Sequence, residues 1–498
     1  MHTGDYRDPG TDERAPVGTT EPQLQVNVVA DDALGSDDAV GLSRRLRRRE
    51  VSVHELTQAA RARAHRANPA LNAVTTWVTD DPPMRPGAAF AGVPSLVKDN
   101  DDLRGYPTTQ GSRAVHDTDA AADSPFVDQL RHLGFVPIAK TTLPEFGLTA
   151  STESTRFGAT GNPWNTGRSA GGSSGGSAAL VAAGVVPLAH ANDGGGSIRI
   201  PASCCGLVGL KPSRGRLIDR PELARLPVPL TVQGVVTRTV RDTAAYYAAA
   251  ERAHRNPALP PIGDVRGPDA ARLRVGVVLH ALYGIPVDAD VVARTADAAS
   301  TLADLGHHVE PLEPPAPQTF GPDFLVYWQL LSLGLRSGGR LLFGAGFDRE
   351  RSEPLTDHLA ERMLLDLPRL PAALTRLRRL ARAGEQAFDT VDVVLSPVLA
   401  HPPPPLGHFG PDVDPRTHLV RLLRWTAFTP MQNVSGSPAL AMPWGHSRDG
   451  LPIGVQMAAP LGQEARLLHL AYELEAASAS RSHPLGVAPR NAELPHRR

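Results

Sequence analysis

Two clusters of glycine and serine lie close together in this sequence, and their residue types suit chemistry on a carbonyl carbon. The first, GGSSGGS, spans residues 171–177, and the second, GGGS, spans residues 194–197. Glycine lets the backbone bend through positive φ and approach a ligand closely, so several N–H groups can point at one oxyanion. Serines held among such amides predict acyl-transfer chemistry.

Glycine and serine together are also typical of flexible linkers. Here the first cluster leads directly into AALVAAG at 178–184, which predicts a helix that ends at a glycine, and then into the apolar segment 185–189. A linker is not joined to a core in this way, so we favour a structured loop.

Other glycine-rich motifs fit less well. The nucleotide-binding patterns GxxxxGK[ST] and GxGxxG do not occur in the sequence. The pattern GxSxG occurs twice, centred on Ser173 and on Ser174, but the nucleophile elbow of α/β-hydrolases requires a buried strand before it. The preceding segment 161–168, GNPWNTGR, is polar and turn-forming, which disfavours the elbow.

Four segments in register resemble successive motifs of the amidase signature family. They are GVPSLVKDN at 92–100, GGSSGGS at 171–177, DGGGSIRIP at 193–201 and GLVGLKP at 206–212. The resemblance covers roughly residues 36–480 and is most specific over residues 90–215. Within the family, residues 189–206 are similar to the branch that contains the 6-aminohexanoate cyclic-dimer hydrolases.

The resemblance implies a Ser-Ser-Lys triad and a Gly172–Ser173 peptide bond in the cis form. Ser197 would be the nucleophile that becomes the acyl-enzyme, Ser173 the bridging serine and Lys98 the base. Lysine can act as a base only when it is neutral, so its pKa must lie well below the usual value of about 10.4. The apolar strand that we predict over residues 91–98 fits such a shift.

The second cluster would stabilise the negative charge of the reaction. The resemblance implies an oxyanion hole formed by the backbone N–H groups of Gly194, Gly195, Gly196 and Ser197. It also implies that Ser174, Asp193 and Arg199 support these loops. Asn192 stands where the family usually has threonine or serine.

Composition places the chain among ordinary globular proteins. It has 498 residues, of which 41% are hydrophobic and 21% are charged, with a net charge of −1. This balance argues against a nucleic-acid or anionic-membrane partner, and the absence of a signal-like or membrane-spanning run predicts a cytoplasmic protein. Cys204 and Cys205 are adjacent, which disfavours a zinc site, and we expect both to be buried. We expect no metal and no cofactor.

Alternating helical and apolar-strand patterns predict an α/β fold, and the resemblance implies a twisted mixed β-sheet sandwiched between α-helices. The region 41–67 looks helical, with a capping box at Ser52 and Glu55, and Asn68-Pro69 is expected to end it. We also expect helices over 127–133 and 289–305, arginine-rich helices between 324 and 388, and strands over 91–98, 135–139, 273–279, 391–395, 440–442 and 453–457.

We expect one amidase domain over residues 31–485, between a disordered N-terminal tail at 1–30 and a flexible C-terminal tail at 486–498. Within it, residues 90–215 would form the catalytic core, and residues 320–430 a helical region on the substrate side. The candidate substrate-binding residues are Thr149, Ala150, Tyr327, Trp328 and Asn433. His190 is interpreted as structural, because the lysine already fills the role of the base.

These patterns predict an amidase that acts on a small linear or cyclic amide, as a monomer or homodimer. Two alternatives stay open. The first is the glutaminase (A-type) subunit of a tRNA-dependent amidotransferase, which would need partner subunits. The second is a non-catalytic binding relative, which the presence of Lys98, Ser173 and Ser197 together disfavours.

Overall fold

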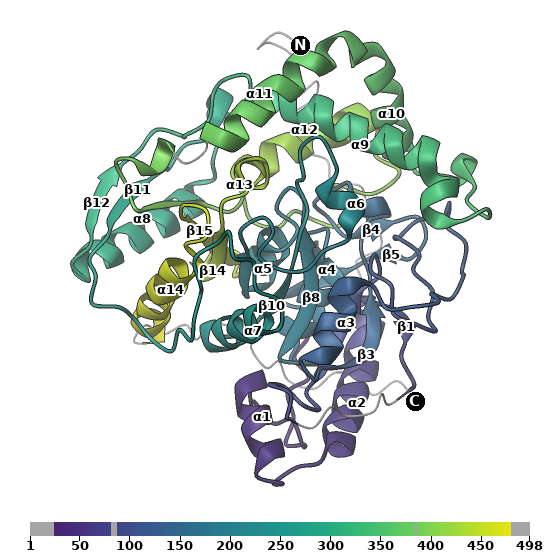
Figure 1. Ribbon diagram of the computed structural model, residues 1–498, viewed down its shortest axis with the longest axis vertical. Coiled ribbons are helices and arrows are strands. Elements are labelled where there is room, and N and C mark those ends of the chain that lie inside the picture. Colours follow the sequence, from purple (N-terminus) through teal and green to yellow (C-terminus); the bar gives the residue numbers. More distant parts are fainter. Residues whose placement is uncertain (1–23, 81–86, 384–385, 480–498) are drawn as a thin grey trace.

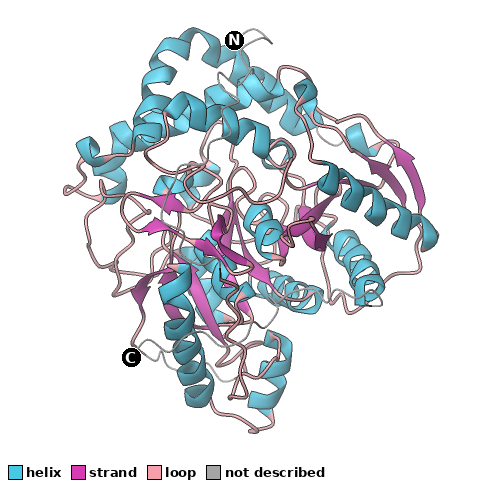
Figure 2. Ribbon diagram, turned by 180° about the vertical axis from the view of Figure 1, so that it is seen from behind, coloured by secondary structure: helices cyan, strands magenta, loops and turns pink. Residues whose placement is uncertain are grey.

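The computed structural model describes residues 24–80, 87–383 and 386–479 (Figure 1). Figure 2 shows most of the strands near the middle of the molecule with helices around them, so the predicted mixed α/β fold is confirmed. In Figure 1, helices α9, α10, α11 and α12 gather at one end of the molecule, and α1 and α2 lie at the opposite end.

The centre of the fold is an eight-stranded mixed sheet with the order β12-β11-β13-β15-β14-β9-β10-β8. Strand β11 pairs in parallel with β12 and β13, and the other neighbours are antiparallel. Its strands are β8 (Leu188–Asp193), β9 (Val208–Lys211), β10 (Val232–Thr237), β11 (Arg274–Val277), β12 (His308–Pro311), β13 (Val393–Pro397), β14 (Ala439–His446) and β15 (Pro452–Ala458).

A three-stranded sheet with the order β1-β3-β2 lies next to β8. It contains β1 (Val74–Trp77), β2 (Pro94–Lys98) and β3 (Val136–Thr141). Side chains join β2 to β8: Ser95 Oγ donates to Leu188 O at 3.1 Å, and the Lys98 N–H donates to His190 Nδ1 at 3.2 Å. The end of β2 is therefore held against the strand that leads into the GGGS loop.

Two short ribbons and the helices complete the described chain. The ribbons pair β4 (Glu153–Ser154) with β5 (Gly158–Ala159) and β6 (Gly161–Asn162) with β7 (Asn165–Ser169). The α-helices are α1 (Ala39–Arg47), α2 (Val53–Leu71), α3 (Pro125–His132), α4 (Gly175–Ala182), α5 (Arg199–Cys205), α6 (Pro221–Ala224), α7 (Val240–Ala253), α8 (Ala289–Asp304), α9 (Phe320–Phe343), α10 (Pro354–Asp366), α11 (Leu370–Ala383), α12 (Pro415–Trp425), α13 (Pro430–Ser435) and α14 (Glu464–Ala479).

The helical pattern at 41–67 contains two helices rather than one, α1 and α2. The predicted capping box is present at the start of α2, where Ser52 and Glu55 bond reciprocally. The prediction that Asn68-Pro69 ends this helix is wrong, because α2 continues to Leu71. Pro69 lacks the N–H of one helical hydrogen bond, yet the helix continues to its cap at Asn72. Beyond the cap, the Asn68 side chain accepts the N–H groups of Ala73 and Val74.

The N-terminal tail prediction is wrong for residues 24–30. Val26 and Val28 are buried, and their N–H groups donate to Pro163 O at 2.7 Å and to Ala183 O at 2.9 Å. The apolar side chains of this segment pack into the core, which orders it. The rest of that predicted tail, residues 1–23, and the predicted C-terminal tail lie outside the described residues.

Candidate active site

Lys98 is the last residue of β2, and its side chain is fully buried. Its Nζ lies 2.7 Å from Ser173 Oγ and 2.7 Å from Asn192 Oδ1. Burial lowers the pKa of Lys98 to about 7, although the negative charges of Asp101 and Asp193 oppose this shift. A large fraction of this amine is therefore neutral near neutral pH.

Ser173 lies in the loop before α4, and the Gly172–Ser173 peptide bond is cis, as the resemblance predicted. Gly147 approaches it closely from the neighbouring loop. A Cβ at this position would lie 3.1 Å from Ser173 Oγ, and the φ of Gly147 is +68°. Both observations favour glycine at residue 147.

Ser197 lies two residues before α5, half-buried at the wall of a pocket. Within the part of the chain that the structure describes, its Oγ has no hydrogen-bond partner. The structure thus brings Lys98 and Ser173 into direct contact and leaves the hydroxyl of Ser197 available to a ligand.

The GGGS loop differs from the expected oxyanion hole at one position. The Gly196 N–H donates to Asp193 Oδ1 at 2.7 Å, so it is not free to bind an oxyanion. A Cβ at Gly196 would collide with Thr429 Oγ1, and its φ is +133°. The N–H groups of Gly194, Gly195 and Ser197 make no hydrogen bond to other described residues.

A buried ion pair holds this loop. Arg199 Nε donates to Asp193 Oδ2 at 2.9 Å, and Arg199 Nη2 donates to Asp193 Oδ1 at 3.0 Å. Burial alone would raise the pKa of Asp193, but Arg199 lowers it to about 2. Asn433 belongs to the same cluster, because its Nδ2 donates to Asp193 and its Oδ1 accepts from Arg199. The expectation that Asn433 lines the substrate pocket is therefore wrong.

Ser174, the third predicted support, directly precedes α4, and its side chain does not cap this helix. Its Oγ donates to Asn192 O at 3.4 Å and is fully buried. This bond connects the GGSSGGS loop with the end of β8, so the two glycine-serine loops are fastened to each other.

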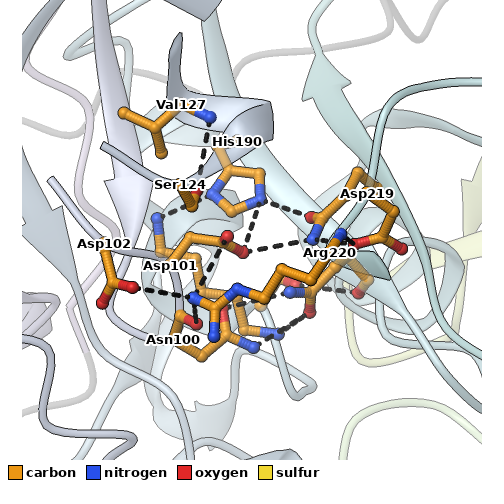
Figure 3. A network of polar contacts seen from close by, with 12 residues as sticks. Asn100, Asp101, Asp102, Ser124, Val127, His190, Asp219 and Arg220 are labelled. Carbon is orange, nitrogen blue, oxygen red and sulfur yellow. Dashed lines mark hydrogen bonds and ion pairs between the residues drawn. The ribbon is translucent and has the colours of Figure 1, made fainter. Parts of the chain in front are cut away.

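The side-chain amides of Asn192 and Asn100 bond to each other next to Lys98. Asn192 Nδ2 donates to Asn100 Oδ1 at 3.1 Å, and Asn100 Nδ2 donates to Asn192 Oδ1 at 3.3 Å. Figure 3 shows Arg220 reaching across to this pair, where its Nη2 donates to Asn100 O at 3.1 Å. Arg220 also pairs with Asp101 at 3.4 Å and with Asp102 at 3.5 Å.

His190 lies at the other end of the network in Figure 3. Its Nδ1 accepts the Lys98 N–H, and its Nε2 lies 2.9 Å from Gln233 Oε1. Burial lowers the pKa of His190. A neutral imidazole with its proton on Nε2 fits both bonds, which supports the structural interpretation.

A pocket opens beside Ser197 and Gly195. Its walls come from the loop at residues 147–150, from α9, from α12 and the residues directly after it, and from the turn at 282–285. The lining residues are Gly147, Leu148, Thr149, Ala150, Gly195, Ser197, Ile200, Leu282, Tyr283, Ile285, Phe320, Gly321, Phe324, Leu325, Trp328, Leu419, Leu422, Leu423, Thr426, Ala427 and Pro430.

A sequence model of the amidase family matches residues 53–468. The chain belongs to the amidase family. Its amidase-signature motifs therefore mark an enzyme that hydrolyses carbon–nitrogen bonds other than peptide bonds.

The amidase is similar to several known proteins along most of its length. It is 48% identical to AmiC of Mycobacterium tuberculosis, provisionally named an amidase, over 91% of this chain and 97% of that one. It is 35% identical to the 6-aminohexanoate-cyclic-dimer hydrolase of a Pseudomonas species, over 88% of this chain and 94% of that one. A solved structure of a 6-aminohexanoate cyclic dimer hydrolase with substrate has a TM-score of 0.80 at 33% identity, covering 89% and 97% of the two chains.

Three of the five predicted substrate-binding residues of the amidase line its pocket: Thr149, Ala150 and Trp328. Tyr327 does not, because it is fully buried on another face of α9, where its Oη bonds to the N–H and C=O of Val228. Neighbouring residues on a helix point about 100° apart, and in α9 Trp328 faces the pocket while Tyr327 faces Val228.

The aromatic residues Phe320 and Phe324 also line the pocket, although they were not among the predicted site residues. Together with Trp328 they recur every four residues along α9 and therefore lie on one face of the helix. The rings of Phe324 and Trp328 are stacked with their centroids 5.5 Å apart. The four-residue spacing could have indicated that these aromatic residues share a pocket wall, although the same spacing is equally typical of a helix face buried in a core.

Cys204 and Cys205 are both fully buried, as expected, and they belong to α5. Burial raises the pKa of both thiols, which keeps them protonated. Within the described residues, no helix is long and apolar enough to cross a membrane.

Proposed function

We propose that this amidase hydrolyses a small linear or cyclic carboxylic amide through an acyl-enzyme on Ser197, with Ser173 and Lys98 as the proton relay. The observation that supports this most strongly is the contact of 2.7 Å between the buried Lys98 Nζ and Ser173 Oγ. A neutral amine at this position can accept the proton of Ser173, which makes the pair a base for a neighbouring hydroxyl.

Acylation would begin when Ser197 Oγ attacks the amide carbon and its proton passes to Ser173, whose own proton passes to Lys98. The new C–O bond forms as the carbonyl π-electrons move to oxygen. The relay then returns a proton to the amide nitrogen, the C–N bond breaks, and the amine leaves. Water attacks the ester in the same way and releases the carboxylic acid and free Ser197.

The negative oxygen of each tetrahedral intermediate would be stabilised by the free N–H groups of Gly194, Gly195 and Ser197. Removal of one such donor typically costs on the order of 3 kcal/mol in the barrier. Asp193 would act indirectly, because it binds the Gly196 N–H and fixes the shape of the loop.

The similarity to 6-aminohexanoate-cyclic-dimer hydrolases makes the neutral cyclic dimer of 6-aminohexanoate a suitable first substrate. We further propose a cytoplasmic protein that is a monomer or homodimer. Light scattering on the purified chain and fractionation of cells that produce it would test these two points.

The nucleophile is tested with a fluorophosphonate probe and intact-protein mass spectrometry on the wild type and Ser197→Ala. We expect one adduct on the wild type and none on the variant. A folded wild type that stays unmodified and hydrolyses no amide would contradict the proposal, as would an adduct that persists in Ser197→Ala.

A further inference from the structure

We propose that the pocket beside Ser197 binds the acyl group of the substrate and selects uncharged, apolar acyl groups, either aryl or medium-chain aliphatic. Acyl groups that end in an ammonium or a carboxylate would be poor substrates. This inference rests on the proposed function, because it takes Ser197 as the nucleophile.

The first support is the absence of charge from the described walls. None of the residues that line the pocket carries an ionised side chain at neutral pH. An isolated ammonium or carboxylate that loses its water in such surroundings pays a cost of several kcal/mol unless it finds a partner. The amidase would therefore reject charged acyl groups through the cost of removing their water, rather than through a specific contact.

The second support is that the polar side chains of the walls, apart from Ser197, are already hydrogen-bonded within the protein. Thr149 Oγ1 lies 2.8 Å from His418 Nε2, and Thr426 Oγ1 donates to Leu422 O at 2.9 Å. Tyr283 Oη donates to Gln318 O at 3.0 Å and accepts the Gly321 N–H at 2.8 Å. Trp328 Nε1 donates to Leu148 O at 3.1 Å. Among the lining side chains, the hydroxyl of Ser197 alone has no such bond to the described chain.

The third support is the position of the aromatic rings. A Cβ built at Gly195 would lie 3.7 Å from Phe324 and 3.8 Å from Trp328, so both rings pack directly beside the GGGS loop. Leu419, Leu422 and Leu423 of α12 also line the pocket. An acyl chain attached to Ser197 would thus lie among aromatic and leucine side chains.

The acyl group is the better candidate for this space than the amine. It stays bonded to Ser197 through both halves of the reaction, whereas the amine departs after the first. Glutamine carries an ammonium and a carboxylate on its acyl part, and a linear 6-aminohexanoyl group carries an ammonium. The walls offer no counterion for either, while an intact cyclic amide is neutral.

Three 4-nitroanilides with the same leaving group test the inference: hexanoyl, 6-aminohexanoyl and the mono-adipoyl derivative, which have equal chain lengths. We expect kcat/KM for the hexanoyl compound to exceed that of each charged compound by at least about 100-fold. Equal values would overturn the inference. An acetyl compound as good as the hexanoyl one would also overturn it, because the pocket would then not hold the acyl chain.

A charge placed in the wall gives the reciprocal test. Leu423 is half-buried at the pocket, so a lysine there can keep its ammonium hydrated. Leu423→Lys should raise the adipoyl to hexanoyl ratio of kcat/KM by about fivefold or more. The control Leu341→Lys lies on α9 at a side chain that is 90% exposed, and it should leave this ratio unchanged. An unchanged ratio in a folded Leu423→Lys would contradict the inference.

Labelling by the fluorophosphonate separates the two proposals. A protein that is labelled at Ser197 and cleaves all three anilides alike retains the proposed function and loses the acyl selectivity. A protein that is neither labelled nor active loses both.

Discussion

Asn192 Oδ1 lies 2.7 Å from Lys98 Nζ, on the amine that also contacts Ser173. An amide oxygen can only accept a hydrogen bond, so Lys98 must donate to it. When Lys98 is neutral, this bond orients the amine and leaves its lone pair for the Ser173 hydroxyl. The Asn100 amide holds Asn192 in that orientation through two further bonds.

Asn192→Asp should keep Lys98, the proposed base, protonated up to a higher pH. A carboxylate at this distance stabilises the ammonium form and raises the pKa of Lys98. The acid limb of kcat/KM should shift to higher pH by one unit or more, while the rate at high pH is largely retained. The control is Asn256→Asp, whose side chain bonds to Gly215 O, outside this network. If the acid limb of kcat/KM stayed at the same pH in the variant, residue 192 would not influence the pKa of Lys98.

The wild-type pH profile should itself report Lys98, whose pKa is lowered to about 7. In the proposed relay the deprotonated amine is the active form. Consequently kcat/KM should rise about tenfold per pH unit below pH 7 and level off above it. Measurement with a neutral amide avoids titration of the substrate. A flat profile between pH 5 and about 8 would be incompatible with a lysine base.

Single alanine substitutions should separate the three proposed catalytic residues from their neighbours. Ser197→Ala should abolish turnover, Lys98→Ala should come close to that, and Ser173→Ala should lose on the order of 10³-fold or more in kcat. Ser177 belongs to the same cluster but bonds to His190 O, so Ser177→Ala should keep most of the activity. Circular dichroism checks that each variant is folded, and full activity in any of the first three would refute the relay.

Removal of Asp193 should cost stability as well as activity. Asp193→Ala leaves Arg199 buried without its counterion, which typically destabilises a protein by about 3–5 kcal/mol. Urea unfolding measures this change. Asp264→Ala removes an exposed partner of Arg266 and serves as the matched control, with no measurable change expected. Similar unfolding midpoints for the two variants would contradict a role for the buried pair.

Lys211 offers a test of how burial of an amine affects stability. It is fully buried, its Nζ donates to Pro212 O at 2.8 Å, and burial lowers its pKa to about 7. Between pH 7 and about 10 the unfolded state therefore binds more protons than the folded state at this residue. Stability contributed by Lys211 must rise with pH in that window.

Comparison with Lys211→Met isolates this effect from other titrating groups. The free energy of unfolding of the wild type, minus that of the variant, should increase from pH 7 to pH 10. A difference that is constant over this range would mean that Lys211 keeps its ordinary pKa in the folded protein.

Local patterns were sufficient for much of the fold and part of the site. The strand that ends at Lys98 and the capping box at Ser52 are short-range features, so sequence spacing alone predicted them correctly. The extent of α2 was missed because Pro69 removes only one helical hydrogen bond, and the helix continues past it to Leu71.

Long-range contacts explain the remaining errors. The bond between the Gly196 N–H and Asp193 lies within one loop, yet its existence depends on the loop shape that Arg199 and Asn433 impose. Asn433 is 240 residues from Asp193 in the sequence, and no spacing rule connects them. Likewise, the spacing groups Trp328 with Phe320 and Phe324 on one face of α9, but only the structure shows that this face borders the pocket.

The pocket and the relay have separate origins along the chain. Lys98, Ser173 and Ser197 all lie before residue 200, whereas most of the residues that line the pocket lie after residue 280, many of them on α9 and α12. Exchange of residues on the inner faces of these two helices leaves every bond of the relay intact. The scaffold is thus modular for evolution and for protein engineering: new acyl preferences can arise in the second half of the gene while the first half conserves the reaction.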